Sequence, residues 1–424
     1  MSAKEINKES DWGLEWWYNA HFTFGVIQNV FIPILIPTFV LETTGSVGAA
    51  GVMLAIIGLG GLTAPIIGAM ADKYQAHRWV QLVALLAYAV GGLLFAYANG
   101  SMVLYYAASA CFGIGSATLL MINPVFIVAA GFTQDDEARR LARMNQTLIF
   151  GQLLAGLGLA AVTSAGLSFQ NRFLMITGVA LVSLVLTAAT NKKAAQRIQV
   201  NSPDSENNGY DESQPDAGTN IGTNAGNIKQ ILLSVFGLFL LAVMFGQFAS
   251  SSLSGQFPTY MQQVFSIDPT ISSATLSVSS VVSLIMLGLV GRWMAKSGPA
   301  PVWLTVMLMY MAAGAALIVL SAGFEQVWQY LPLAIYIIYL QALAWQDMVT
   351  PALAARASTA GAATTQGFLL FVLASGYALV SVLSAETADI FGFTSLAWIV
   401  LAGAVMAFFT GRMAIRIMSK HAAI

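Results

Sequence analysis

The chain has 424 residues, of which 57% are hydrophobic and only 9% are charged, and its formal net charge is −1. Soluble domains carry about 25% charged residues, so this composition excludes an ordinary soluble protein and places the chain in a lipid bilayer.

Long apolar stretches follow one another along the chain, each close to or above the ~20 residues with which a helix crosses the hydrocarbon core. We predict transmembrane helices over 19–42, 46–71, 79–98, 102–131, 143–166, 172–190, 232–262, 270–293, 300–322, 329–353, 358–384 and 392–415. The first is preceded by four acidic residues and has no small-residue cleavage site, so we expect it to be retained rather than removed as a secretion signal.

Basic residues are distributed very unevenly when the loops are assigned alternately to the two sides of the membrane. Seventeen of the eighteen Lys and Arg residues fall on the side of the N-terminus, and Arg172 alone falls on the other. The positive-inside rule therefore predicts an even number of spans with both termini cytoplasmic. We expect an integral protein of the cell membrane, either a plasma membrane or a bacterial inner membrane.

A polar segment over 191–228, rich in Asn, Ser, Asp and Gly, interrupts the series of spans and has almost nothing to bury. We predict a flexible cytoplasmic linker there. It divides an N-terminal six-helix half (19–190) from a C-terminal six-helix half (229–418), with a cytoplasmic N-terminal segment (1–18) and a cytoplasmic tail (419–424).

The two halves share residues at a nearly constant offset. Gly25 and Gly246 lie 221 residues apart, and each is followed twelve residues later by Pro-Thr and an aromatic residue. Gln146 and Gln366 lie 220 residues apart. With an even number of spans in each half, such repeats must be parallel and related by an axis along the membrane normal.

The loop after the second span carries Gly68-Ala-Met-Ala-Asp72-Lys73-Tyr74, followed by Arg78. This pattern resembles the loop 2–3 signature of the major facilitator superfamily. The resemblance implies an all-α integral membrane fold of twelve helices in two parallel six-helix repeats, and a secondary active transporter that works by alternating access. It also implies that Gly68, Asp72, Lys73 and Arg78 form a cytoplasmic gate, with Asp72 at a helix N-terminus.

The chain departs from this family pattern at three places. Arg292 stands where the second half would carry an acid matching Asp72, Ala110 stands where an Arg would precede Gly113-Ile-Gly115, and the fifth span lacks a Gly-Pro pair. The first departure leaves no matching latch in the second half. The other two argue against proton-driven drug export.

In the family that the chain resembles, spans 1, 4, 7 and 10 surround a central cavity. Asn and Gln in a membrane need a partner or a wet cavity, so we favour amides over Gly and Ser stripes as ligands. The candidate substrate-binding residues on these spans and on spans 5 and 11 are Gln28, Asn29, Asn123, Asn145, Gln146, Gln247, Tyr336, Tyr339, Gln341, Trp345 and Gln366.

Asp347 is the only acid well inside any predicted span. A carboxylate there costs several kcal/mol unless it is paired, hydrated or protonated. Three interpretations stay open: proton coupling, a structural bond to Arg143 or Arg356, and direct contact with the solute. His21 is a second candidate proton-coupling group.

A cavity short of fixed charge favours a neutral, zwitterionic or amphipathic solute. No catalytic motif or His/Cys metal pattern occurs, so we expect no enzyme, cofactor or metal site. The expected partners are a small organic solute, protons and membrane lipids, with no nucleic acid and a monomeric state. The alternatives are a passive facilitator and a non-transporting receptor or assembly factor of the same fold.

Overall fold

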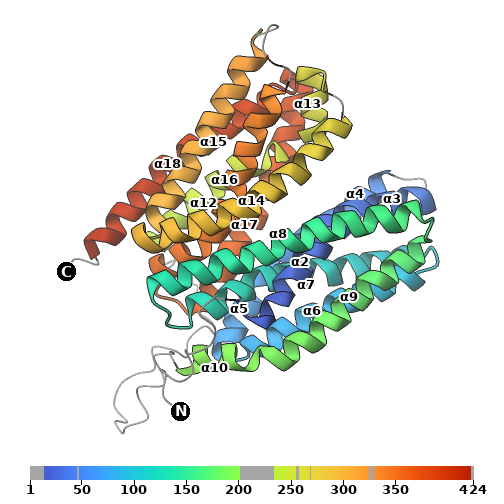
Figure 1. The fold of residues 1–424 in the computed structure, drawn as a ribbon, viewed down its shortest axis with the longest axis horizontal. Coiled ribbons are helices and arrows are strands. Elements are labelled where there is room, and N and C mark those ends of the chain that lie inside the picture. Colours follow the sequence, from blue (N-terminus) through green and yellow to red (C-terminus); the bar gives the residue numbers. More distant parts are fainter. Residues whose placement is uncertain are drawn as a thin grey trace. The chain divides into compact units, whose positions relative to one another are not determined.

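The structure is a computed structural model that describes residues 14–44, 47–200, 234–254, 257–267, 269–323, 328 and 330–421. Within these ranges the regular elements are all helices and no strand occurs (Figure 1). The helices form two compact units, Met1–Asn224 with Ala360–Phe371, and Ala225–Thr359 with Val372–Ile424. Since α17 starts in the first unit and continues in the second, this one helix is shared between them.

The first unit contains the helices of predicted spans 1 to 6. They are α2 (Asn19–Val26), α3 (Ile32–Thr44), α4 (Val47–Leu59), α5 (Ala64–Lys73), α6 (His77–Tyr97), α7 (Met102–Val128), α8 (Gln134–Ser164), α9 (Phe169–Thr190) and the short α10 (Lys192–Val200). A 3₁₀ turn, Gly60–Thr63, joins α4 to α5. Around a core of apolar side chains, α6 packs against α7 and α9, and α2 packs against α8.

The second unit contains the helices of predicted spans 7 to 12. They are α12 (Val235–Ser251), α13 (Phe257–Phe265), α14 (Pro269–Ser297), α15 (Pro299–Ser321), α16 (Leu331–Ala357), α17 (Ala362–Phe391) and α18 (Ser395–His421). Here α15 packs against α16 and α18, and α12 packs against α18. The third helix of each half therefore contacts the fourth and the sixth, as a parallel repeat requires.

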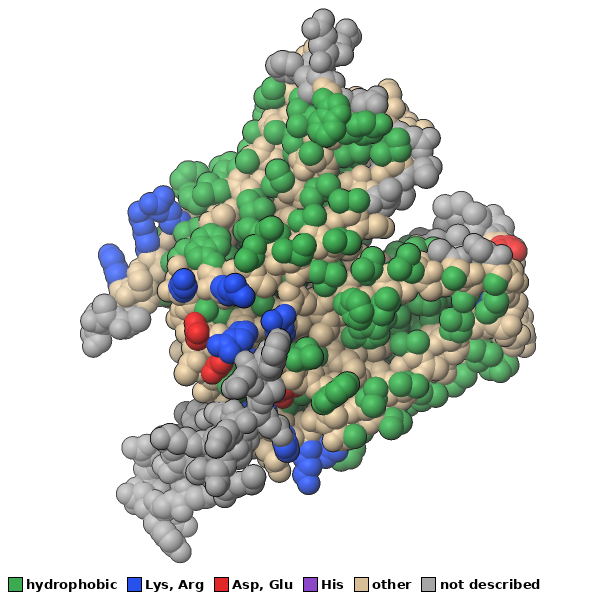
Figure 2. All heavy atoms as spheres, in the orientation of Figure 1, with side chains coloured by type: hydrophobic (Ala, Val, Ile, Leu, Met, Phe, Trp, Pro, Cys, Tyr) green, Lys and Arg blue, Asp and Glu red, His purple; other side chains and the backbone are tan. Residues whose placement is uncertain are grey.

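Ten helices in the described ranges are long and apolar enough to cross a membrane, and α12 is a shorter apolar helix. The remaining predicted span lies in α8, where Thr147–Ser164 carries no charged residue. Each of the twelve predicted spans thus has a helical counterpart. Figure 2 shows hydrophobic side chains spread over the visible flanks of the helices, which is typical of surfaces that face lipid.

Helical structure extends beyond the predicted spans, most clearly at α8 and α10. Helix α8 begins at Gln134 rather than at 143, because Asp135, Asp136 and Glu137 in its first turn suit the positive end of the helix dipole. Helix α10 occupies the first residues of the segment predicted as a flexible linker, and it buries Ala194, Arg197 and Ile198. That part of the linker prediction was wrong; the stretch 201–233 lies outside the described residues.

Glycines allow the first and fifth spans to pack with their backbones almost in contact. A Cβ on Gly25 would overlap the carbonyl oxygen of Leu148, and a Cβ on Gly151 would overlap the carbonyl oxygen of Phe22. The contact is reciprocal, since each glycine lies against the backbone of the other helix. Close approach through small residues is a main source of helix association in membranes.

This packing yields a matched test on α8. Gly151→Ala forces two backbones apart, so we expect it to lower the thermal unfolding temperature in detergent by several degrees. Gly158→Ala on the same helix meets no atom within 4 Å. Since Ala is favoured over Gly in a helix interior by about 1 kcal/mol, that control should be neutral or slightly stabilising, and an equal loss in both variants would contradict the packing argument.

Candidate functional site

The first and seventh spans are both irregular, at neighbouring positions of the repeat. In the first span a π-helical turn, Ile27–Phe31, separates α2 from α3. In the seventh, α12 ends at Ser251 and the next described helix, α13, begins at Phe257. The 221-residue offset between the halves maps the π-helical turn onto 248–252, the stretch where α12 ends, so the two irregularities lie within about one helical turn of each other in the repeat. Interrupted helices at matching positions of two repeats are the best structural indication of a solute site in a carrier.

Side chains on the π-helical turn give the first unit a polar face. The side chain of Gln28 accepts a hydrogen bond from Ser116, whose hydroxyl lies 2.9 Å from that of Tyr88. Asn29 is exposed and donates a weak 3.4 Å hydrogen bond to Gln152. Gln28 and Asn29 therefore remain accessible, and Asn29 keeps most of its hydrogen-bonding capacity.

In the second unit, aromatic rings line the end of α12. Phe257 and Tyr336 stack with centroids 3.4 Å apart, and Tyr336 in turn stacks on Tyr339 at 5.3 Å. The Tyr339 hydroxyl lies 3.0 Å from the carbonyl oxygen of Ala249 and 2.5 Å from that of Ser250. These carbonyls lack partners within α12 because the helix ends one residue later, so Tyr339 satisfies polar groups that the interruption releases.

Asp347 is exposed on α16. In the described part of the second unit it forms no ion pair with Arg356, and its carboxylate lies close enough to the Tyr310 phenol for an electrostatic interaction. An acid inside an apolar span that remains accessible, without a cationic partner in its own unit, is able to exchange a proton with its surroundings.

One predicted amide, Asn123, instead belongs to a buried hydrogen-bonded chain across the first unit, which also contains the candidate His21. Arg78 Nε donates to Asn191 (3.0 Å), Asn191 donates to Gln81 (3.1 Å), Gln81 donates to Asn123 (2.8 Å), and Asn123 donates to Nδ1 of His21 (3.1 Å). Because His21 accepts at Nδ1, a proton arriving at that atom must first displace Asn123. Sequence reasoning missed Gln81 and Asn191, although each is an amide near the end of an apolar helix.

The other candidate ligands also have internal contacts. The Gln341 side chain accepts a hydrogen bond from Ser283 (3.0 Å) and donates one to Ser279 (3.1 Å). Both partners lie on α14, so the amide of Gln341 is already hydrogen-bonded at its oxygen and its nitrogen. The remaining candidates are likewise placed within their own units: Asn145 donates to the Leu141 carbonyl, Gln146 accepts from Arg143, Gln247 donates to Ser251, Trp345 packs edge-on against Trp293, and Gln366 is buried.

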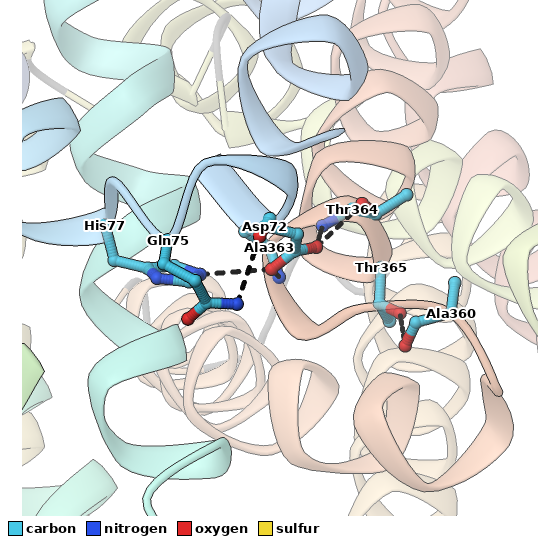
Figure 3. Close-up of polar contacts among 7 residues, drawn as sticks. All are labelled: Asp72, Gln75, His77, Ala360, Ala363, Thr364 and Thr365. Carbon is cyan, nitrogen blue, oxygen red and sulfur yellow. Dashed lines mark hydrogen bonds and ion pairs between the residues drawn. The ribbon is translucent and has the colours of Figure 1, made fainter. Parts of the chain in front are cut away.

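Asp72 caps the N-terminus of α17 (Figure 3). Its carboxylate accepts the backbone N–H groups of Ala363 (3.1 Å) and Thr364 (2.7 Å) and the Thr364 hydroxyl (2.7 Å). His77 Nε2 lies 3.0 Å from the same carboxylate and holds it from the opposite side. A carboxylate at this position satisfies free N–H groups and interacts favourably with the helix dipole, as the resemblance implied.

Close backbone contact surrounds this cap. A Cβ on Gly68 would overlap the Ala363 carbonyl, and a Cβ on Gly361 would overlap the Asp72 carboxylate. Of the two basic residues in the signature, Lys73 is exposed beside the Tyr74 ring. Arg78 donates to the Ala188 carbonyl at 2.9 Å. Arg78 thus joins the signature loop to the end of α9 rather than to an acid.

A second charged cluster joins the start of the first span to α8 and α10. Glu15 forms ion pairs with Arg140 and with Arg197 (2.7 Å), and it accepts a 2.9 Å hydrogen bond from the Trp17 indole. Both guanidinium groups lie over the Phe132 ring, at 4.2 and 5.3 Å from its centroid. Neither Arg140 nor Arg197 was a predicted functional residue. Their partner, Glu15, lies before the first apolar stretch, where no helical periodicity in the sequence marks it as a functional residue.

The cap on α17 can be tested by substitution. We expect Asp72→Ala to cost about 0.5–2 kcal/mol, the usual penalty for losing an N-cap, and to speed amide hydrogen exchange in peptides that cover Ala363 and Thr364. Asp72→Asn keeps one acceptor oxygen and should show a smaller effect. Glu386→Gln removes an exposed acid from the same helix and serves as the control; unchanged exchange in Asp72→Ala would rule out the cap.

The buried charge cluster gives a second test. Glu15→Gln leaves two nearly buried guanidinium groups, with side-chain exposures of 6% and 2%, without this counter-charge. Removing one partner of a buried ion pair costs about 3 kcal/mol or more. Asp135→Asn breaks an exposed pair with Arg139 on α8 and should cost less than about 1 kcal/mol. Equal shifts in unfolding temperature for the two variants would refute the structural role of Glu15.

Comparison with solved structures shows the same fold in several membrane transporters. The chain matches the proton:xylose symporter XylE with a TM-score of 0.67 at 15% identity, covering 95% of this chain and 94% of that one. It matches the E. coli fucose:proton symporter FucP with a TM-score of 0.65 at 15% identity, covering 94% and 97%. A bacterial homologue of the iron transporter ferroportin gives 0.68 at 12% identity, covering 98% and 100%.

No curated protein sequence matches the chain. The family model described as the Major Facilitator Superfamily matches residues 18–385, which is most of the chain. The apolar helices and the paired six-helix architecture agree with that match. The chain is an integral membrane protein and belongs to the Major Facilitator Superfamily.

Proposed function

We propose that the protein is a secondary active transporter that moves a small uncharged organic solute by alternating access, coupled to protons through Asp347. The observation that carries the proposal is the pair of helix irregularities at neighbouring repeat positions of spans 1 and 7. Interrupted helices place polar backbone and side-chain groups at membrane depth, where a solute that leaves water needs hydrogen bonds.

The accessible polar groups define the solute chemistry of this proposal. Gln28 and Asn29 lie in the π-helical turn, where Gln28 is half-buried and Asn29 exposed, and each is given one side-chain hydrogen bond inside the unit. Asn123 and Gln341 are buried and are fully engaged inside their units. We therefore assign Gln28 and Asn29 to solute binding and the buried amides to positioning the helices. Hydroxyl groups of a neutral solute suit such amides. XylE and FucP are proton symporters for sugars, so sugars are the first solutes to test.

In this proposal the Asp72 cap acts as a cytoplasmic latch. Because α17 begins in the first unit and continues in the second, breaking the cap frees the start of a helix that both units share. His77, bonded to the same carboxylate, keeps Asp72 aimed at the helix N-terminus. Arg78 keeps the latch loop in place by bonding to the end of α9, and Lys73 lies exposed beside the Tyr74 ring.

Two other functions are distinguishable by experiment. A passive facilitator equilibrates its solute but does not concentrate it when a proton gradient is imposed. A receptor or assembly factor with this fold binds a partner and gives no flux at all. Asp347 is exposed and forms no ion pair with a described residue of its own unit, which favours coupled transport over both, because neither alternative needs a titrating group inside a span.

The test uses the full chain in proteoliposomes with a panel of pentoses and hexoses. For one-to-one coupling, a gradient of one pH unit supports about tenfold accumulation. Asp347→Asn should abolish this accumulation and spare exchange of labelled for unlabelled solute. The control Glu386→Gln should accumulate normally. Accumulation that survives in Asp347→Asn would remove Asp347 from the coupling step.

A further inference from the structure

The last turns of α18 carry three basic residues at four-residue spacing, namely Arg412, Arg416 and Lys420, and all three are exposed. Two exposed apolar side chains share their face: Phe409 (66% exposed) and Met413 (57%). Residues four apart lie above one another on a helix, so these side chains form one continuous strip with an apolar start and a cationic end.

The opposite face of α18 fixes the direction of this strip. Ala404, Ala407 and Ala414 are fully buried, and a Cβ on Gly411 would overlap the Trp303 ring of α15. Small residues on this face let α18 pack closely on α12 and α15. The rotation of the helix is thereby set, and the strip from Phe409 to Lys420 points away from the unit. Figure 2 shows Lys and Arg side chains gathered at that end of α18.

The strip has no acidic partner among the residues that the structure describes. After Asp389 the sequence contains no further acid, and none of its three basic residues forms an ion pair with a described residue. The corresponding end of the first unit differs, because there Arg197 of α10 is buried against Glu15. Arg197 thus has an internal counter-charge, whereas the three basic residues of the strip have none among the described residues.

The position of the strip along the membrane suits a lipid headgroup. The apolar helix runs over Ser395–Lys420, 26 residues. At 1.5 Å per residue this is about 39 Å, longer than the ~30 Å hydrocarbon core, so its last turns reach the headgroup region. A shallow hollow of about 770 Å³ lies along the strip, lined by Phe409, Arg412, Met413, Arg416, Ile417, Ser419 and Lys420.

We propose that this strip is a binding site for an anionic phospholipid. The guanidinium groups of Arg412 and Arg416 hold the headgroup phosphate, because Arg binds phosphate oxygens through paired N–H donors. Lys420 adds a third positive charge, and Phe409 and Met413 lie along the acyl chain. The site is independent of the solute site and of Asp347.

The test compares two double variants that remove the same charge. Arg412→Gln with Arg416→Gln alters the strip, whereas Arg292→Gln with Lys296→Gln removes an exposed basic pair at the same four-residue spacing from the end of α14. Binding of phosphatidylglycerol to the full chain in detergent is measured by native mass spectrometry, with phosphatidylcholine of identical acyl chains as the neutral lipid. A basic residue that contacts the bound headgroup contributes about fivefold, so the α18 variant should bind about thirtyfold more weakly. Arg292 and Lys296 lie outside the hollow, so the α14 variant should bind less than twofold more weakly.

Three outcomes would overturn the proposal: equal weakening in both double variants, equal binding of phosphatidylcholine, or displacement of the lipid by inorganic phosphate at matching concentration, which would identify a free-anion site. If the α18 double variant does not fold, Lys420→Gln alone should still weaken binding by several-fold. Arg412→Lys with Arg416→Lys, which keeps the charge, should retain part of the affinity but lose the paired contacts.

Discussion

The structure depends on one constraint: in lipid, each backbone N–H and C=O group must find its partner inside the protein. Helices meet this requirement along their length but not at their ends or interruptions. Tyr339 covers the carbonyls released where α12 ends, and Asp72 covers the free N–H groups where α17 begins. Both side chains come from other helices. The end of one helix is therefore stabilised only when a second helix lies in the position that supplies its hydrogen-bond partner.

This dependence underlies our proposal that the solute binds at the interrupted regions and that the helix cap acts as a latch. At the π-helical turn of the first span, Gln28 and Asn29 have access to the surface of their unit. The amides in the hydrogen-bonded chain that runs from Arg78 to His21 instead bond to one another. The chain of buried amides ties four segments of the first unit at one level. The unit is therefore expected to move as one body, with the adaptable polar groups confined to the interruption.

Charge is handled differently at the ends of the two halves. In the first, Glu15 draws Arg140 and Arg197 into the protein, where both guanidinium groups pack on Phe132. In the second, the basic residues of α18 remain exposed beside apolar side chains. The repeat thus conserves the packing of helices while leaving their charged ends free to differ, since the headgroup region accepts either arrangement.

The sequence by itself determined the all-α membrane fold, the twelve spans and the Asp72 signature, because hydropathy, basic-residue asymmetry and a short motif are local properties. It also singled out Asp347 as an acid inside a span. Only the tertiary structure decided which amide side chains are accessible and which are hydrogen-bonded to other helices. Gln341 and Asn29 look alike in the sequence, yet Gln341 bonds to Ser283 of α14 and Asn29 is exposed. Partners from distant helices set this difference, and no local pattern records them.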